Sequence, residues 1–393
     1  MRLILALALA AVAAAPAAMA APPLVMQSAV LLMRHGVRPP THEPALSPAI
    51  APDAWPTWPV APGDLTPHGA AAVRRLAAYD RIWLAAAGLL PATGCPAAVT
   101  IYADVDQRTV ATGQAYADAF APGCGLKVEH AAGARDPLFS ALDTPDSTFD
   151  SKAAKAAMLQ AAGGNLDAVM ESNLSLFQKM QAALAPDQTA FLKLPSKISA
   201  KQSGALPKLS GPLAEGASAA EDFLLEYLEG MPLSQVAWGR VSATEIQTLL
   251  ALHPLAYTIT ARPAPIADRA AAPLAARILA SLTSGQKFTV LVGHDTNQAQ
   301  LGGMLNLHWQ AAGYPADDPP PDGGLLFTLW RDPATAKQYV TVSYQSQSMD
   351  QIRSLRVLSS SDPPSVEPLA IPGCGNSVAV TACALGSFQT LSK

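Results

Sequence analysis

The residues Arg34-His35-Gly36-Val37-Arg38 place an imidazole between two guanidinium groups, and Pro39 and Pro40 follow directly. A neutral imidazole is a competent nucleophile, and guanidinium groups bind tetrahedral oxyanions through several planar hydrogen bonds. Gly36 allows close approach of the backbone, and the two prolines stiffen the loop. This combination suits a phosphate group.

Two further polar clusters could complete such a site. Arg108 follows the sequence "VTIYADVD" and opens a predicted helix, where it would present a third guanidinium group at a helix N-terminus that already favours anions. Taken alone, an arginine at a helix start is more often solvated. In "GHDTN", His294 could donate to a phosphate oxygen, and Asp295 could act as a general acid that protonates a departing alcohol.

Each cluster comes directly after an apolar run, at residues 29–33, 99–103 and 288–292. Helical patterns follow each run, one of them capped by Thr66 with Pro67 in its first turn. Strand, polar loop and helix repeated in this way predict an α/β fold with a mainly parallel sheet flanked by helices. Ligands bind such sheets outside the carboxyl ends of the strands, so we expect the three clusters to meet in one pocket.

The pattern changes between residues 149 and 261 to helical stretches separated by loops rich in Ser, Gly and Pro. We interpret this segment as an inserted, mostly α-helical cap domain. Residues 21–148 and 262–393 would then form the α/β domain.

The first twenty residues have one positive residue, Arg2, then an apolar run and small residues at A-x-A spacing. This pattern predicts a secretory signal peptide at residues 1–20, cleaved near Ala20, and therefore a periplasmic or secreted protein. The alternative, a membrane anchor, is disfavoured because the run is too short to span a bilayer.

Composition limits the partners of the chain. With 393 residues, 50% hydrophobic and 14% charged, it is globular, and its formal net charge of −4 makes nucleic acid an improbable partner. The remaining histidines show no H-E-x-x-H or H-x-H spacing, and no P-loop or G-x-S-x-G motif occurs. We therefore expect no metal and no cofactor. No later apolar run is long enough to span a membrane, so we expect no membrane partner, and the lack of an obvious amphipathic interface helix makes a monomer the default.

The four cysteines, Cys95, Cys124, Cys374 and Cys383, form an even set in an exported chain. Three pairings are possible. Short loops favour Cys95 with Cys124 and Cys374 with Cys383, and free buried thiols are the alternative.

Taken together, these motifs resemble the histidine acid phosphatases, whose signature is R-H-G-x-R-x-P near the mature N-terminus with an H-D pair far downstream. The stretches "PDAWPTWPV", "LTPHG", "ADVDQRT", "GHDTN" and "PPPDGG" are similar in order and spacing to the bacterial periplasmic phytases. The likeness runs from about residue 29 to residue 388. It implies an α/β domain with an inserted α domain and a site in the cleft between them.

The resemblance also implies a role for individual residues. His35 would be the nucleophile that forms a phosphohistidine, and Asp295 would protonate the leaving oxygen and later activate water. The other matching positions would contact the phosphoryl group or line the substrate cleft: Arg34, Arg38, Arg108, His294, Thr41, Thr296 and Met231.

Two departures from the family bear on substrate preference. His42 stands where the phytases carry a lysine, so it would add positive charge only at acid pH. The helical segment also lacks the cysteines that those relatives carry. The resemblance implies a metal-independent acid phosphatase for phosphate monoesters with an acid optimum, and phytate is the favoured substrate. The alternatives are a glucose-1-phosphatase, a broad-specificity periplasmic acid phosphatase and, more remotely, a non-catalytic phosphate-binding protein.

Overall fold

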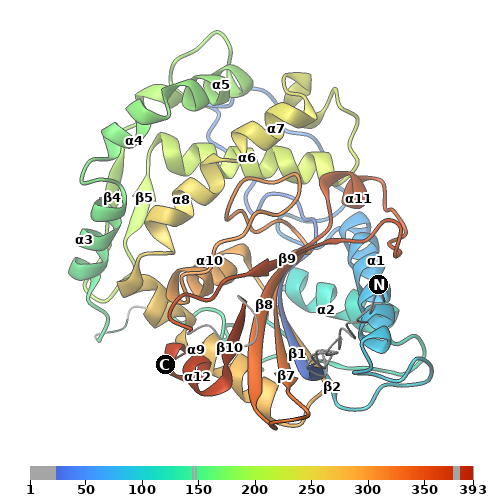
Figure 1. The fold of residues 1–393 in the computed structure, drawn as a ribbon. Coiled ribbons are helices and arrows are strands. Elements are labelled where there is room, and N and C mark those ends of the chain that lie inside the picture. Colours follow the sequence, from blue (N-terminus) through green and yellow to red (C-terminus); the bar gives the residue numbers. More distant parts are fainter. Residues whose placement is uncertain (1–23, 144–145, 147, 375–380, 393) are drawn as a thin grey trace, which may run out of the picture.

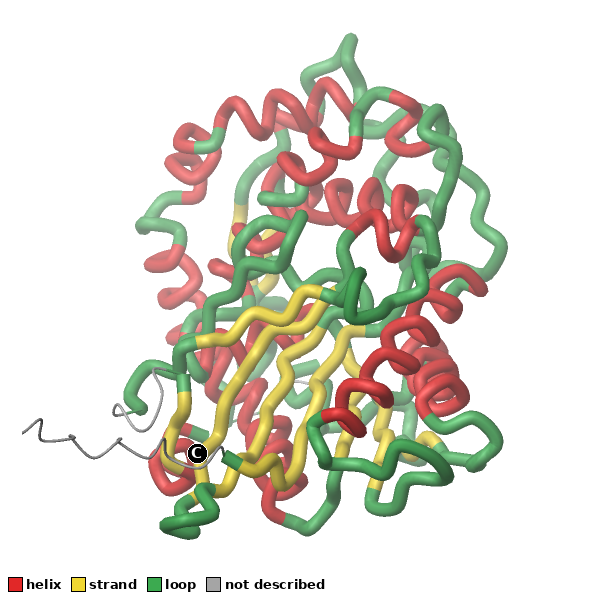
Figure 2. Tube along the Cα trace, turned by 45° about the vertical axis from the view of Figure 1, so that its right-hand side comes forward, coloured by secondary structure: helices red, strands yellow, loops and turns green. Residues whose placement is uncertain are grey.

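The computed structural model describes residues 24–143, 146, 148–374 and 381–392. Its main sheet has the strand order β10-β8-β7-β1-β6-β2-β3, with β9 paired to β8 (Figures 1 and 2). The strands are β1 (Val25–Arg34), β2 (Val99–Ala103), β3 (Val128–Glu129), β6 (Phe288–Gly293), β7 (Gly324–Arg331), β8 (Gln338–Ser346), β9 (Ser365–Leu369) and β10 (Ala382–Ala384).

The half of the sheet that carries the polar clusters is parallel, as predicted. β1 runs parallel to β6, β6 to β2, and β2 to β3. The other half is antiparallel, because β7 and β8 form a hairpin and β9 and β10 both pair with β8 in the opposite direction. A short connection can join only antiparallel neighbours, and only six residues separate β7 from β8.

Helices cover both faces of the parallel half. Helices α1 (Pro67–Ala86) and α2 (Gln107–Phe120) pack on one face, and α9 (Ala264–Thr283) and α10 (Asp295–Met304) pack on the other. Leu31 and Met33 belong to the core under α1 and α2, whereas Val30 and Leu32 belong to the core on the opposite side. Both faces of β1 are therefore buried, which explains its unbroken apolar run.

The helix starts agree closely with the sequence signals. Thr66 caps α1 through a hydrogen bond from Gly69 N to its hydroxyl group, and Pro67 is the first helical residue. Arg108 is the second residue of α2. Helix α10 begins at Asp295, so Asp295 lies in its first turn.

Helices α3 to α8 gather beyond one end of the sheet (Figure 1). A small hairpin, β4 (Lys197–Ser199) and β5 (Lys208–Ser210), lies among them. One apolar cluster joins residues of this region to residues of the sheet, so the division into two domains stays a prediction. The helices are α3 (Ser151–Ala161), α4 (Leu166–Ser172), α5 (Leu174–Leu184), α6 (Pro212–Leu228), α7 (Ala243–Leu249) and α8 (Leu252–Thr260); α11 (Met349–Arg353) and α12 (Leu385–Leu391) follow near the C-terminus.

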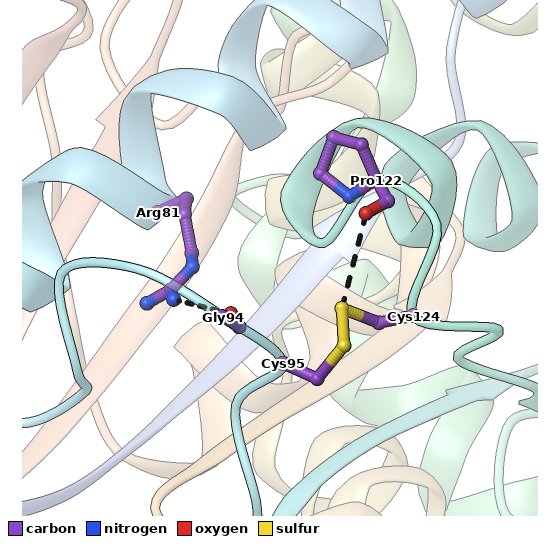
Figure 3. The surroundings of a disulfide bond; sticks show 5 residues. All are labelled: Arg81, Gly94, Cys95, Pro122 and Cys124. Carbon is purple, nitrogen blue, oxygen red and sulfur yellow. Dashed lines mark hydrogen bonds between the residues drawn. A yellow bond between two sulfur atoms is a disulfide. The ribbon is translucent and has the colours of Figure 1, made fainter.

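Both predicted disulfides are confirmed. Cys95 and Cys124 join the loops that follow α1 and α2, with Cα atoms 5.4 Å apart. Figure 3 shows this bridge beside Arg81 of α1, whose guanidinium group donates to the carbonyl oxygen of Gly94 at 3.2 Å. Cys374 and Cys383 form the second bridge, with Cα atoms 5.1 Å apart. Such cross-links stabilise a fold chiefly by constraining the unfolded chain.

The predicted signal peptide, residues 1–20, lies outside the described residues. Within the part of the chain that the structure describes, no helix has the length and apolar character needed to cross a membrane.

Candidate active site

The backbone brings the ends of β1, β6 and β2 together. Arg34, the last residue of β1, pairs with Gly293 at the end of β6. His35 N donates to Gly293 O at 3.0 Å, and Asp104 N donates to Val292 O at 2.9 Å. The three polar clusters, distant in sequence, therefore lie side by side at one edge of the sheet, as the strand pattern predicts.

The His35 ring is buried and held in one tautomer. Its Nδ1 lies 2.8 Å from Gly36 O, and because a carbonyl oxygen only accepts, Nδ1 carries the proton. Burial, followed by the guanidinium groups of Arg38 and Arg34, holds the pKa of His35 well below its usual value. The imidazole is therefore neutral, with an unprotonated Nε2.

Gly36 has no room for a side chain. A Cβ atom there would lie 2.8 Å from Leu65 Cδ1 and 3.0 Å from Asp322 Oδ1. The backbone N–H of Gly36 donates to Thr112 Oγ1 at 3.1 Å, which ties the loop to α2. The glycine therefore lets the His35 loop pack directly against its neighbours.

Arg34 is completely buried and lies between two carboxylates. It forms an ion pair with Glu221 of α6, and its Nη2 lies 3.0 Å from Asp295 Oδ2. Burial alone would raise the pKa of Asp295, but Arg34 and His253 lead a group of cations that hold this pKa well below the usual range. Asp295 is therefore ionised before a ligand binds.

His253 extends this network on the side of the helical region. Its Nδ1 lies 2.8 Å from Asp318 Oδ1 and 3.8 Å from Glu221 Oε2. Burial lowers the pKa of His253, but the hydrogen bond to Asp318 and the charge of Glu221 outweigh it, so the net shift is upward. Buried charges consequently alternate in sign along this network, which lowers the cost of keeping them in the interior.

Arg108 and His294 meet at the ends of β2 and β6. Arg108 Nη2 lies 2.6 Å from Asp106 Oδ2 and 3.4 Å from His294 Nδ1. His294 Nε2 lies 2.8 Å from Asp104 Oδ2, so Nε2 carries the proton that this carboxylate accepts.

Asp104, Asp106 and His294 also place their ligand atoms within 4.8 Å of one another, a separation that could suit a divalent cation. A cation there would have to displace Arg108 from Asp106 and would meet its positive charge. The guanidinium group makes this corner better suited to an anion.

A cavity of about 550 Å³ lies between the loop after His35 and the helices α6, α8 and α10. The predicted residues Arg38, Thr41, His42, Asp295 and Thr296 line it. Several lining residues were missed from the sequence, including Lys208, Glu221, Asp222, His253 and Tyr257. The adjacent acidic residues in "AEDFLL", which are flanked by apolar residues, are the signal that could have identified two of them.

Met231 is the other residue that the family resemblance predicts to line the substrate cleft. Its side chain packs in the apolar core beyond the end of α6, and it is not among the residues that line the cavity. Its carbonyl oxygen accepts a hydrogen bond from Arg353 at 2.8 Å. The apolar side chain gains more from burial in the core than from facing a polar cavity.

Comparison with known proteins shows the family of the chain. A sequence profile of the histidine phosphatase superfamily (branch 2) matches residues 25–203. Phytase AppA of Escherichia coli is 35% identical, over 92% of this chain and 90% of its own length. A glucose-1-phosphatase of Salmonella typhimurium is 32% identical, over 88% of this chain and 86% of its own length.

Solved structures agree with the sequence comparison. The Hafnia alvei phytase in complex with tartrate has a TM-score of 0.88 and 31% identity, covering 94% of this chain and 96% of that one. The phytase from Citrobacter braakii has a TM-score of 0.87 and 31% identity, covering 94% of this chain and 97% of that one. The chain therefore belongs to the histidine phosphatase superfamily, in its branch 2.

Proposed function

We propose that this phosphatase transfers the phosphoryl group of a monoester to Nε2 of His35 and then to water, without a metal ion. The observation that carries the proposal is the buried, neutral His35 imidazole, with its proton fixed on Nδ1, beside Arg34 and Arg38. Arg34, Arg38 and Arg108 each keep a buried Nε–H group without a hydrogen-bond partner among the described residues. A bound phosphoryl group would offer oxygens to these guanidinium groups.

In the first step, His35 Nε2 attacks phosphorus, a P–N bond forms and the P–O bond to the alcohol breaks. The guanidinium groups stabilise the charge on the phosphoryl oxygens, which is the main requirement of phosphoryl transfer. The alcohol oxygen needs a proton as it leaves, and Asp295, in the first turn of α10, would supply it.

Asp295 is ionised in the ligand-free site, so it must gain a proton as the substrate binds. A phosphate monoester supplies one, because its second ionisation has a pKa of about 6 and the monoanion prevails in acid. The bound phosphoryl group also offsets the positive charge of Arg34, which favours protonation of the neighbouring Asp295.

In the second step, water attacks the phosphohistidine. Asp295 accepts a proton from this water, the P–N bond breaks, and phosphate leaves with neutral His35 restored. The same carboxyl group therefore acts as acid and then as base, as microscopic reversibility requires.

Phytate is the substrate that we favour. Relatives along nearly the whole chain are phytases, and the cavity has room for a ring-sized leaving group. His42 and Lys208 on its wall could attract additional phosphates, and Thr41 and Thr296 could contact them. A glucose-1-phosphatase is the second candidate, favoured by the relative of that name and by the acidic Glu221 and Asp222 on the same wall.

We also propose that the chain is exported to the periplasm or secreted as a monomer. The two disulfides support an oxidising compartment, and the N-terminal pattern supports a cleaved signal peptide.

The test is phosphate release by the mature protein at about pH 5 with excess chelator, using phytate, glucose 1-phosphate and an aryl phosphate. We expect release from all three, fastest from phytate. Preference for glucose 1-phosphate would retain the mechanism and change the substrate. Activity that disappears with the chelator and returns with a divalent metal would contradict the metal-independent mechanism.

A further inference from the structure

Asp222 is an acidic residue in the wall of the reaction cavity. It lies on the face of α6 that borders the cavity, and the residue is only 6% exposed. The cavity-lining residues of this helix follow the three- and four-residue spacing of one helix face: Ala214, Ala217, Ser218, Glu221 and Asp222.

Its carboxyl group has no protein partner, unlike those of its neighbours. Glu221 pairs with Arg34, Glu226 accepts from Ala237 N at 2.8 Å, and Glu229 accepts from Thr66 Oγ1 at 2.6 Å. Among the described residues, no group donates a hydrogen bond to the Asp222 carboxyl, and no Lys, Arg or His forms an ion pair with it. The Asp222 oxygens are not among the buried side-chain atoms that lack a partner, so they open onto the cavity that this residue lines. A ligand that enters the cavity can therefore supply the hydrogen-bond partner.

The charge state of this carboxyl group limits what that partner can be. Burial raises the pKa of Asp222 to about 8, against the opposing effect of Arg38 and with a further contribution from Glu221. In acid, the group is therefore neutral, and it can both donate and accept a hydrogen bond. An alcohol hydroxyl group does the same, so the two are complementary. A phosphate group is a poor partner here, because Asp222 carries no positive charge and its neighbour Glu221 is a carboxylate paired with Arg34.

We propose that Asp222 is a specificity-determining residue that hydrogen-bonds a free hydroxyl group of the leaving alcohol. The substrate class is the phosphate monoesters of polyols that retain at least one hydroxyl group, such as sugar phosphates and partly dephosphorylated inositol phosphates. Phytate itself has no free hydroxyl group and cannot make this contact before its first phosphate is removed. The inference rests on the proposed phosphomonoester hydrolysis at His35 and specifies its leaving group.

The test compares two substrates with the same ring, myo-inositol monophosphate and cyclohexyl phosphate, which differ only in the hydroxyl groups. We expect Asp222→Leu to lower kcat/KM for the inositol ester about tenfold and to leave kcat/KM for the cyclohexyl ester within twofold. A site that hydrogen-bonds a substrate hydroxyl group discriminates against an analogue that lacks this hydroxyl group. Asp222→Leu should therefore remove the preference for the inositol ester. Asp222→Asn keeps a donor and an acceptor and should restore most of the ratio.

Glu226→Gln is the matched control, because Glu226 is a buried carboxyl group one turn further along α6 and outside the cavity. It should leave the ratio unchanged. Since the readout is a ratio measured on one protein sample, loss of folded protein cancels.

Suppose that the wild-type enzyme cleaves both esters and that Asp222→Leu leaves the ratio of their kcat/KM values unchanged. This result would overturn the role of Asp222. A loss confined to phytate would also overturn it, because Asp222 would then bind phosphate. If the wild-type protein cleaves neither these esters nor an aryl phosphate, the proposed function itself is wrong.

Discussion

Replacing Asp295 with Asn should change leaving-group chemistry and phosphate affinity in opposite directions. Asparagine retains the shape of the side chain and the oxygen that accepts from Thr296 N at 2.7 Å, but it cannot supply a proton. For an alkyl phosphate, whose alkoxide is a poor leaving group, we expect kcat/KM to fall about 10²- to 10⁴-fold. For an aryl phosphate with an acidic phenol, the loss should be far smaller because that oxygen leaves without a proton.

Phosphate affinity should rise in the same variant. Asp295 lies 3.0 Å from Arg34, so its negative charge faces any phosphate that this guanidinium group binds. Two unit charges about 4 Å apart interact by about 4 kcal/mol at an effective dielectric constant of 20. If about one third of this repulsion acts on bound phosphate, its removal contributes about 1.4 kcal/mol, or tenfold in affinity. We therefore expect inorganic phosphate to inhibit Asp295→Asn about tenfold more strongly at pH 7, where the wild-type carboxyl group is ionised.

The assay is kcat/KM for a series of phosphate esters with graded leaving-group pKa, together with the inhibition constant of inorganic phosphate. The ratio kcat/KM covers the steps up to the phosphohistidine, so slow hydrolysis of the intermediate does not mask the effect. Glu226→Gln serves again as the control with a buried carboxyl group outside the cavity. Equal losses for alkyl and aryl esters, or weaker phosphate inhibition, would refute the assignment of Asp295 as the acid.

Three further predictions follow from the same geometry. His35→Ala should abolish turnover while calorimetry still detects phosphate binding at the arginines; a remaining burst of product would identify another nucleophile. Glu221→Gln should lower the free energy of unfolding by about 3 kcal/mol near pH 6, because it leaves buried Arg34 without one charged partner. Burial raises the pKa of Glu221, but Arg34 and His253 outweigh burial, so the pKa is lowered overall. The stabilisation by Glu221 is therefore present above about pH 4.3 and is lost as pH falls further. If urea unfolding showed the same difference between variant and wild type at every pH, this prediction would be contradicted. Finally, kcat/KM should fall as pH rises through about 6, where the substrate loses the proton that Asp295 needs, and a rate still climbing above about pH 7 would contradict this proton source.

Local patterns in the sequence were sufficient to predict the elements that carry the chemistry. Three buried runs followed by polar residues predicted β1, β2 and β6 and the convergence of their ends. This prediction succeeds because parallel strands are fixed by burial on both faces, and because every strand of a parallel set ends at the same edge. The disulfide pairing was also predictable, because joining cysteines that are close in sequence closes a short loop at a low cost in chain entropy.

The antiparallel half of the sheet was less accessible from the sequence. The direction of β7 and β8 depends on which side of the parallel strands they join. That choice is made by tertiary packing, which no local pattern encodes.

The sequence by itself identified the groups that we propose to react: His35, the arginines and Asp295 stand out by residue type and by their spacing next to strand ends. Only the tertiary structure decided their charge states and surroundings. Glu221, His253 and Asp222 come from helices far along the chain, and their effect on the site depends on distance and burial, which sequence spacing does not specify. The packing of the Met231 side chain in the apolar core is likewise a feature that its sequence motif does not specify. Electrostatic energies depend on separation and on the surrounding dielectric, and both exist only once the chain has folded.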